Sequence, residues 1–315
     1  MYDIFKMLAV SSPLTSAAFA KHFGKTEEKA KERVREFLID SNEEAIHDIR
    51  VAIRRLDSSI RIFPNTLRNL QKISNYRSQY KTLFKINSEI RDLDIISSKI
   101  KKYSPRIGVQ QTTSVEQQLH EKRSEKLKEA REKALLTYEI KPLRVNHGEI
   151  SEKKLQQRFQ KIVTRFACRI DQILPIVASD IGKTNELHQL RKDCKKLRYT
   201  LEVLDDEARQ NEVVLSLIGY LEDLQDVLGL IHDCDIMIEH LKANYSNYLI
   251  SGGESNIYHK MLQIEQNERQ VLYHAFVDSP GGNLGREEGN VELALPRNNS
   301  GRRIIKVAAS QQTIT

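Results

Sequence analysis

Two short stretches of the chain place a histidine ahead of regularly spaced cations. The first stretch reads His47-Asp-Ile-Arg50-Val-Ala-Ile-Arg54-Arg55-Leu56, and the second reads His188-Gln-Leu-Arg191-Lys-Asp-Cys-Lys195-Lys196-Leu197. The arginine guanidinium donates hydrogen bonds in a planar fork that fits phosphate oxygens, and histidine adds a neutral donor or a charge that appears as the pH falls. These residue types therefore favour the binding of phosphate groups.

The spacing of the cations predicts that they form ladders along two helices. At about 100° per residue, His47, Arg50 and Arg54 fall within roughly 60° of one another, and Arg61 returns to the same face. The second stretch repeats this spacing. The rise from His47 to Arg61 is about 21 Å, which is longer than one phosphate group. A single phosphate group cannot occupy such a ladder, whereas a chain of phosphates can.

The two stretches belong to a larger internal repeat. The second histidine follows the first by 141 residues (188 − 47), and Ile90-Arg91-Asp92-Leu93-Asp94-Ile95 is echoed by Ile231-His232-Asp233-Cys234-Asp235-Ile236 at the same offset (233 − 92). The cations recur where their neighbours change, which indicates a duplicated unit with a shared functional face. We expect the aspartates of each echo to pair with Arg or Lys of the neighbouring basic helix and to hold those cations in place.

The hydrophobic pattern predicts that these motifs lie on helices. A stripe of period 3.6 runs through Ile46, Ile49, Ile53, Leu56 and Ile60, and Pro64 ends that helix. Similar patterns predict helices at about 67–103, 114–138, 152–179, 185–205, 212–245 and 254–276, after a helix-forming stretch at 26–38. Because no segment alternates as a β-strand does, we expect an all-α fold. It comprises two four-helix units, at about residues 15–140 and 150–278, and a flexible tail at 279–315.

Composition sets further limits on function. The chain has 315 residues, a formal net charge of +7 and a pI near 9.1, which favours a polyanionic partner. The three cysteines are scattered, which argues against a disulfide framework or a cysteine zinc site, and no apolar run is long enough to span a bilayer. Asp3 and Pro13 disrupt the three-part layout of a signal peptide, so we expect a cytoplasmic protein. We also expect neither a metal nor another cofactor.

The motifs resemble those of the conserved histidine α-helical domain family, known as CHAD. The resemblance extends over about residues 15–278, and it depends on the two basic stretches, on Arg91-Asp-Leu-Asp94, and on Leu224-Gln-Asp-Val-Leu-Gly-Leu-Ile-His-Asp-Cys-Asp235. It implies two four-helix bundles related by pseudo-twofold symmetry, a basic cavity or channel between them, and the binding of inorganic polyphosphate. The E-x-E-x-K motif of the triphosphate tunnel enzymes that often accompany this family is absent from the sequence, so we expect this chain to be the binding domain alone.

The resemblance also implies which residues bind polyphosphate. Arg61 is added because it lies on the same helical face as His47 and Arg54. The predicted binding residues are therefore His47, Arg50, Arg54, Arg55, Arg61, His188, Arg191, Lys195, Lys196 and Arg198. Some positions depart from the pattern between the copies, since Asp57 takes the place of Arg198 and Lys81 takes the place of Glu222. The two walls of the predicted channel therefore differ in charge. Polyphosphate as the partner also suggests association with polyphosphate granules.

Two other functions compete with polyphosphate binding. His47-Asp48 and His232-Asp233 are similar to the metal-holding dyad of phosphohydrolases, but their counterparts are His188-Gln189 and Arg91-Asp92, so neither dyad is kept between the copies. Nucleic-acid binding fits the charge, but aromatic residues make up 6% of the chain and do not interleave with the basic stretches. We therefore expect a non-enzymatic receptor for polyphosphate, with nucleic acid and membranes disfavoured as partners.

Overall fold

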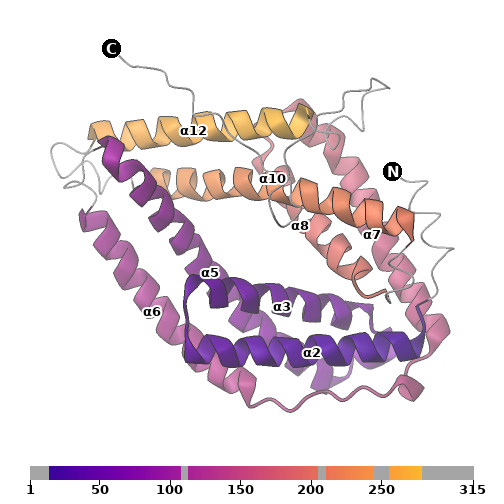
Figure 1. The fold of residues 1–315 in the computed structure, drawn as a ribbon. Coiled ribbons are helices and arrows are strands. Elements are labelled where there is room, and N and C mark those ends of the chain that lie inside the picture. Colours follow the sequence, from indigo (N-terminus) through magenta and orange to yellow (C-terminus); the bar gives the residue numbers. More distant parts are fainter. Residues whose placement is uncertain (1–13, 108–112, 205–210, 245–254, 279–315) are drawn as a thin grey trace.

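A computed structural model describes residues 14–107, 113–204, 211–244 and 255–278. Within these ranges the regular structure is helical and consists of α2 (Ser16–Ile39), α3 (Glu43–Ile62), α4 (Asn65–Arg68), α5 (Gln71–Ile107), α6 (Thr113–Tyr138), the 3-10 turn η2 (His147–Glu149), α7 (Glu152–Ser179), α8 (Thr184–Leu201), α10 (Glu212–Ala243) and α12 (Ser255–Asp278) (Figure 1). These ranges contain no strand, so the all-α prediction is confirmed. The tail predicted at 279–315 lies outside the described residues.

The first basic helix begins and ends where its sequence dictates. The Asn42 side chain accepts a hydrogen bond from the backbone N–H of Ala45 at 2.8 Å, which satisfies one of the free donors at the start of α3. Glu43 and Glu44 lie in the first turn, where the helix dipole favours carboxylates. Pro64 follows α3, as predicted, and precedes the four-residue helix α4, which the hydrophobic pattern did not predict.

α2 is longer than the stretch at 26–38 from which it was predicted. Thr15 caps its N-terminus by accepting a hydrogen bond from the backbone N–H of Ala18 at 3.2 Å. Phe19 and Phe23 in its first turns are buried against Phe63, with ring centroids 5.3 and 4.9 Å from that ring. Ala17, Ala18 and Ala20 favour a helix in this segment, and the burial of the two phenylalanines carries the helix through Gly24, which has a low helix propensity.

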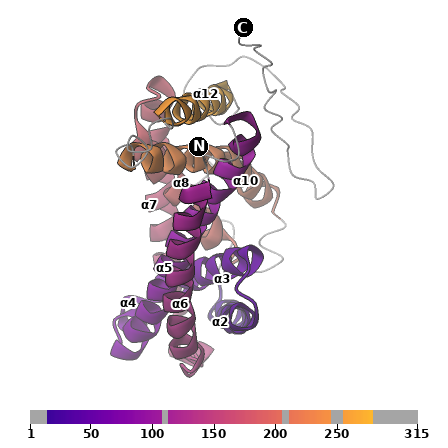
Figure 2. The ribbon, with the colours of Figure 1, turned by 90° about the vertical axis from the view of Figure 1, so that its left-hand side faces the viewer.

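The helices pack as neighbouring pairs, α2 with α3, α5 with α6, α7 with α8 and α10 with α12. Figures 1 and 2 show the α2–α3 pair at one end of the molecule and the α10–α12 pair at the other, with α5 and α6 spanning the distance between them. Contacts of α3 with α8 and of α5 with α10 join the two halves of the chain. Since α3 also contacts α5 and α8 contacts α10, the four helices that carry the repeated motifs meet one another.

Buried apolar side chains form two clusters that fix these contacts. The larger cluster includes the predicted stripes of α3, from Ile46 to Ile60, and of α8, from Leu187 to Leu201. The smaller cluster joins α5 to α10 and α12 through residues such as Ile100, Tyr103 and Met237. No described helix combines the length and the apolar character needed to cross a lipid bilayer. Because α3 and α8 bury their apolar stripes, their basic arcs face in defined directions.

Candidate polyanion-binding site

Cations of α3 and α8 converge where the two helices meet. Arg50 and Arg54 come from α3, Arg191 and Lys195 come from α8, and each is close enough to the others to affect their protonation. We call these four residues the central cluster. The guanidinium groups of Arg50 and Arg54 lie 5.8 and 5.1 Å from the centre of the Phe84 ring on α5, which is within cation–π distance. The structure therefore brings together predicted residues from both copies.

The central cluster has few anionic partners. The buried Nε atoms of Arg50 and Arg191 have no hydrogen-bond acceptor in the described part of the chain, and no carboxylate oxygen there lies within 4.0 Å of a cation of the cluster. Burial, followed by repulsion from Arg191, Arg54 and Arg50, lowers the pKa of Lys195 to about 6. Burial, followed by repulsion from Arg54, lowers the pKa of Arg50 to about 9. Buried like charges are unfavourable alone and are stabilised when an anion binds.

The histidines of this region are neutral at pH 7. The rings of His188 on α8 and His232 on α10 have centroids 4.7 Å apart, and their Nδ1 atoms lie 3.3 Å apart. Burial, with smaller contributions from nearby cations, lowers the pKa of His188 to about 4 and that of His232 to about 3. His47, the other predicted histidine, is exposed to solvent. The two partly buried rings therefore offer neutral N–H donors rather than charge.

The second aspartate of each D-x-D pair connects helices outside the central cluster. Asp94 accepts a hydrogen bond from Arg123 of α6 at 2.6 Å, and Asp235 accepts one from Arg269 of α12 at 2.5 Å. The prediction that these aspartates pair with the basic helices is therefore wrong for Asp94 and Asp235. Residues two apart on a helix point in different directions, so only one aspartate of each pair can face the basic helix.

The first aspartate of each pair, Asp92 or Asp233, faces the central cluster. Arg50 and Arg191 act electrostatically on Asp92, and Arg191 and Lys195 act on Asp233. Burial raises the pKa of both carboxyl groups, although these cations oppose the shift. The two carboxylates offset part of the positive charge of the cluster but leave an excess of cations.

Arg55 and Arg198 are paired with carboxylates. Arg55 Nε lies 2.8 Å from an oxygen of Glu202, while Arg198 lies 2.7 Å from Glu222 and 3.8 Å from Glu202. Glu202 thus contacts a predicted cation from each half of the chain. These two predicted residues have internal anionic partners, which distinguishes them from the central cluster.

The positions at which the two copies differ in charge form an ion pair within each half. Asp57 lies 4.0 Å from Lys81 in the first half, whereas Arg198 lies 2.7 Å from Glu222 in the second. Both pairs join the helix that carries the H-x-x-R motif to the helix that carries the D-x-D motif. The same positions therefore form an ion pair in both halves with the signs reversed.

Arg61 and Lys196 meet at α7 rather than in the central cluster. The Phe166 ring of α7 has the Arg61 guanidinium at 5.7 Å and the Lys196 ammonium at 5.6 Å from its centre. Arg61 forms an ion pair with Asp57, and Lys196 lies 3.5 Å from Asp193. The ladder that the sequence predicts thus divides into a central part and a part beside α7.

A pocket of about 650 Å³ opens beside the central cluster. Its α3 and α8 sides are lined by predicted cations, namely Arg54, Arg55, Lys195 and Arg198. Its α10 side is lined by the carboxylates of Glu222, Asp223, Asp226 and Asp233. The pocket is therefore basic on one side and acidic on the other, and the basic channel implied by the resemblance stays a prediction.

Two further residues contribute to the site without having been predicted as binding residues. Arg91 lies near Arg50 and Asp233, and His232 stacks on His188. Arg91 and His232 occupy equivalent positions in the second repeated motif (232 − 91 = 141). That equivalence is the signal in the sequence that points to these two residues, because the repeated motif contains them beside its aspartates.

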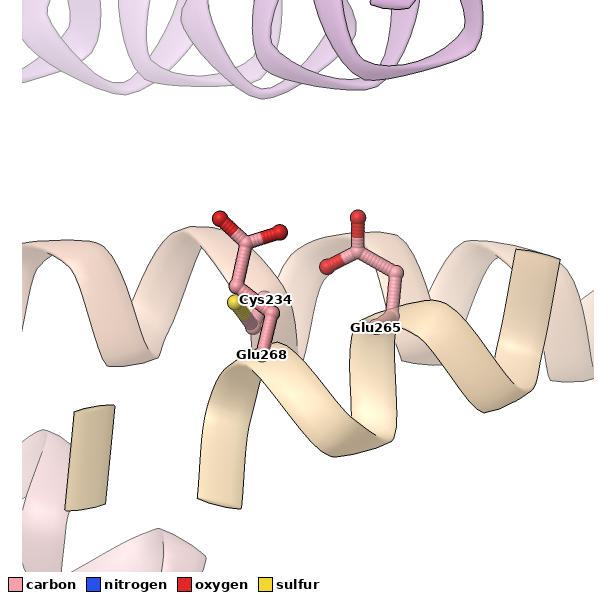
Figure 3. A group of neighbouring side chains, drawn as sticks. All are labelled: Cys234, Glu265 and Glu268. Carbon is pink, nitrogen blue, oxygen red and sulfur yellow. The ribbon is translucent and has the colours of Figure 1, made fainter. Parts of the chain in front are cut away.

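One group of side chains in the described part of the chain has the spacing of metal ligands. Figure 3 shows it, with Glu265 and Glu268 extending from the same side of α12 and Cys234 from α10. The Lys99 ammonium donates to both oxygens of Glu265, at 2.9 and 2.7 Å, and Tyr103 also donates to Glu265. An ammonium group therefore already balances these carboxylates. The group includes no residue of either His-Asp dyad.

Comparison with known proteins identifies the family of the chain. A family model for the CHAD domain matches residues 17–242, which is more than half of the chain. Among solved structures, the crystal structure of the CHAD domain from the plant Ricinus communis is similar, with 17% sequence identity, a TM-score of 0.45 and coverage of 86% of this chain and 89% of that one. A search of curated proteins found no match. By the extent of the family-model match, the chain belongs to the CHAD domain family.

Proposed function

We propose that the protein binds inorganic polyphosphate, or a similar linear polyanion, without catalysing a reaction. The central cluster is the observation that carries this proposal, because four cations from two helices converge without a carboxylate oxygen within 4.0 Å among the described residues. Charged side chains are rarely buried unless a partner balances them. Membership of the CHAD family supports polyphosphate as that partner.

Binding without catalysis is supported by the surroundings of the His-Asp dyads. His232 stacks on His188, and Asp48 forms an ion pair with Arg33 at 3.0 Å. A dyad that activates water through a metal needs both of its side chains available to one ion. These contacts therefore favour binding over hydrolysis. We further propose a cytoplasmic location, and the proposed ligand suggests association with polyphosphate granules.

The proposal is tested by the double substitution Arg54→Ala with Lys195→Ala, which removes one cation from each basic helix. Two lost charge-assisted hydrogen bonds should weaken the Kd for polyphosphate about a hundredfold. Isothermal titration calorimetry with polyphosphate of defined length measures this, and circular dichroism should show unchanged helical content. Wild-type affinity should fall as salt is raised, because phosphate binding releases counterions.

Lys101→Ala with Lys128→Ala is the matched control, since both lysines are exposed on α5 and α6. Equal loss of affinity in the two double variants, or no loss in either, would show that the central cluster is not the site.

Displacement of long-chain polyphosphate by duplex DNA at equal phosphate concentration would identify nucleic acid as the ligand. Chelator-sensitive release of phosphate would instead demonstrate hydrolysis.

A further inference from the structure

α7 presents a face of cations that lies outside the repeated motifs. At about 100° per residue its cations fall within roughly 80° of one another and extend over about 22 Å. They are Lys154, Arg158, Lys161, Arg165 and Arg169. Lys154, Lys161 and Arg165 are exposed, and the other two are partly exposed. The buried residues of α7, from Leu155 to Val177, point to the protein interior.

The absence of acidic residues distinguishes this face from an ordinary charged helix surface. Residues 153–170 contain six Lys or Arg and no Asp or Glu. In contrast, α2 begins the first half of the chain with six Lys or Arg and four Glu, and its Lys29 pairs with Glu32 at 2.6 Å. Solvated helix faces usually mix the two signs, because like charges three or four residues apart repel each other.

Other elements direct cations toward the same face. Arg158 Nε donates to the backbone carbonyl of Arg61, at the end of α3, at 3.2 Å. Arg68 of α4 and Arg77 of α5 also lie close to Arg158, and together with Arg165 and Arg61 they add to the effect of burial in lowering its pKa. Arginines from three other elements of the fold therefore gather beside α7.

This cationic face is connected to the central cluster. Lys196 follows Lys195 on α8 and lies over the Phe166 ring of α7, as Arg61 does from α3. Asp57, which pairs with Arg61, and Asp193, which lies 3.5 Å from Lys196 and 3.1 Å from Arg169, balance part of the charge of this connection. Cations thus continue from the meeting point of α3 and α8 onto α7, so one extended polyanion can contact both regions.

We propose that the cationic face of α7 binds the part of a long phosphate chain that extends beyond the central cluster. The inference rests on the proposed function and adds a second site to it. A short oligophosphate contacts the central cluster alone, whereas a long chain contacts both regions. The α7 face therefore makes the protein selective for long chains.

The test is the triple variant Lys154→Gln, Lys161→Gln and Arg165→Gln. These exposed residues have no carboxylate oxygen within 4.0 Å in the described ranges, so the fold should not change. Calorimetry compares tripolyphosphate with long-chain polyphosphate. We expect the Kd for the long chain to weaken about tenfold and its salt dependence to become shallower, because phosphate contacts are lost. The Kd for tripolyphosphate should stay the same.

A second triple variant, Lys21→Gln, Lys25→Gln and Lys29→Gln, removes the same charge from exposed positions of α2 and should leave both affinities unchanged. Equal weakening in the two triple variants would mean that net charge, not the α7 face, matters. An unchanged long-chain Kd in the α7 variant, or a weakened tripolyphosphate Kd, would also overturn the inference.

If the wild-type protein binds neither ligand, the proposed function itself fails. Loss of RNA binding with polyphosphate binding intact would assign the α7 face to nucleic acid instead.

Discussion

At the scale of single residues, Lys195 carries a charge that depends on the ligand. Burial and its arginine neighbours lower the pKa of this amine to about 6, so most of it is neutral at pH 7 in the free protein. A bound phosphate chain places negative charge beside the amine and raises its pKa, so binding takes up a proton. Affinity should then fall as the pH rises above about 6, because protonating the amine costs progressively more free energy.

We predict that polyphosphate binding at pH 7 takes up protons and that Lys195→Arg abolishes most of this uptake while retaining affinity. Arginine keeps its charge across this pH range, so no proton has to be added on binding. Calorimetry in buffers of different ionisation enthalpy measures the number of protons. Lys192→Arg, at an exposed lysine of the same helix, serves as the control and should keep the uptake. A wild-type affinity that is constant between pH 6 and 8 would contradict the prediction.

The sequence identifies every member of the central cluster, because the cations recur at helical spacing in both copies. It does not reveal that Arg55 is paired with Glu202, which lies 147 residues away in the chain. Nor does it show that Lys196 lies over Phe166 of α7. Periodicity tells which side of a helix a residue occupies, whereas the groups opposite that side depend on how the helices pack.

At the scale of helices, the second aspartate of each D-x-D pair fixes one helix to the next. The Asp94 side chain is 2% exposed and is paired with Arg123 of α6. Because water solvates this pair poorly, each of the two charges is stabilised mainly by the other. Breaking such a pair leaves a poorly solvated cation between α5 and α6. These ion pairs fix α5 and α10 in place, so that Asp92 and Asp233 on the same helices face the central cluster.

We predict that Asp94→Ala lowers the free energy of unfolding by about 3 kcal/mol, the usual cost of breaking a buried ion pair. The matched control is Glu89→Ala, which removes an exposed ion pair with Lys126 between the same two helices and should have little effect. Urea denaturation of both variants measures the difference. Equal losses would mean that burial does not set the strength of these pairs.

Most helices could be predicted from the sequence because apolar period and end signals agree. α7 spans Glu152–Ser179, as expected from its stripe, and α3 begins after the Asn42 cap. The predicted stretch begins after Gly24, a poor helix former, whereas α2 runs through that glycine from an alanine-rich first turn and is held there by the packing of Phe19 and Phe23. α4 was missed because four residues are too few to show a period.

At the scale of the whole molecule, a ligand of the central cluster binds α3 and α8 together. We predict that saturating polyphosphate raises the Tm by about 5 °C, since a ligand at a hundredfold excess over its Kd adds about 2.7 kcal/mol to the free energy of unfolding. Differential scanning calorimetry measures the shift. At the same ligand concentration the Arg54→Ala, Lys195→Ala variant, with its hundredfold weaker Kd, should shift by about 1 °C, and a shift equal to that of the wild type would place the ligand elsewhere.

The sequence repeat predicts that the two halves resemble each other, but it does not predict how they join. Contacts of α3 with α8 and of α5 with α10, and the apolar cluster around Tyr103 and Met237, depend on complementary surfaces that a hydrophobic pattern does not encode. The sequence likewise does not predict the acidic α10 wall of the pocket, although Glu222 is one of the positions where the two copies differ in charge.

Arg55 and Arg198 reach the pocket from different halves of the chain, yet both are paired with the carboxylate of Glu202, and Arg198 is also paired with Glu222. Their side chains have therefore lost much of their rotamer freedom before any ligand arrives. A phosphate group that takes the place of Glu202 exchanges one anion for another and immobilises little that was mobile. Glu202 thus preorganises the edge of the pocket, and the entropy that usually opposes binding is lost during folding instead.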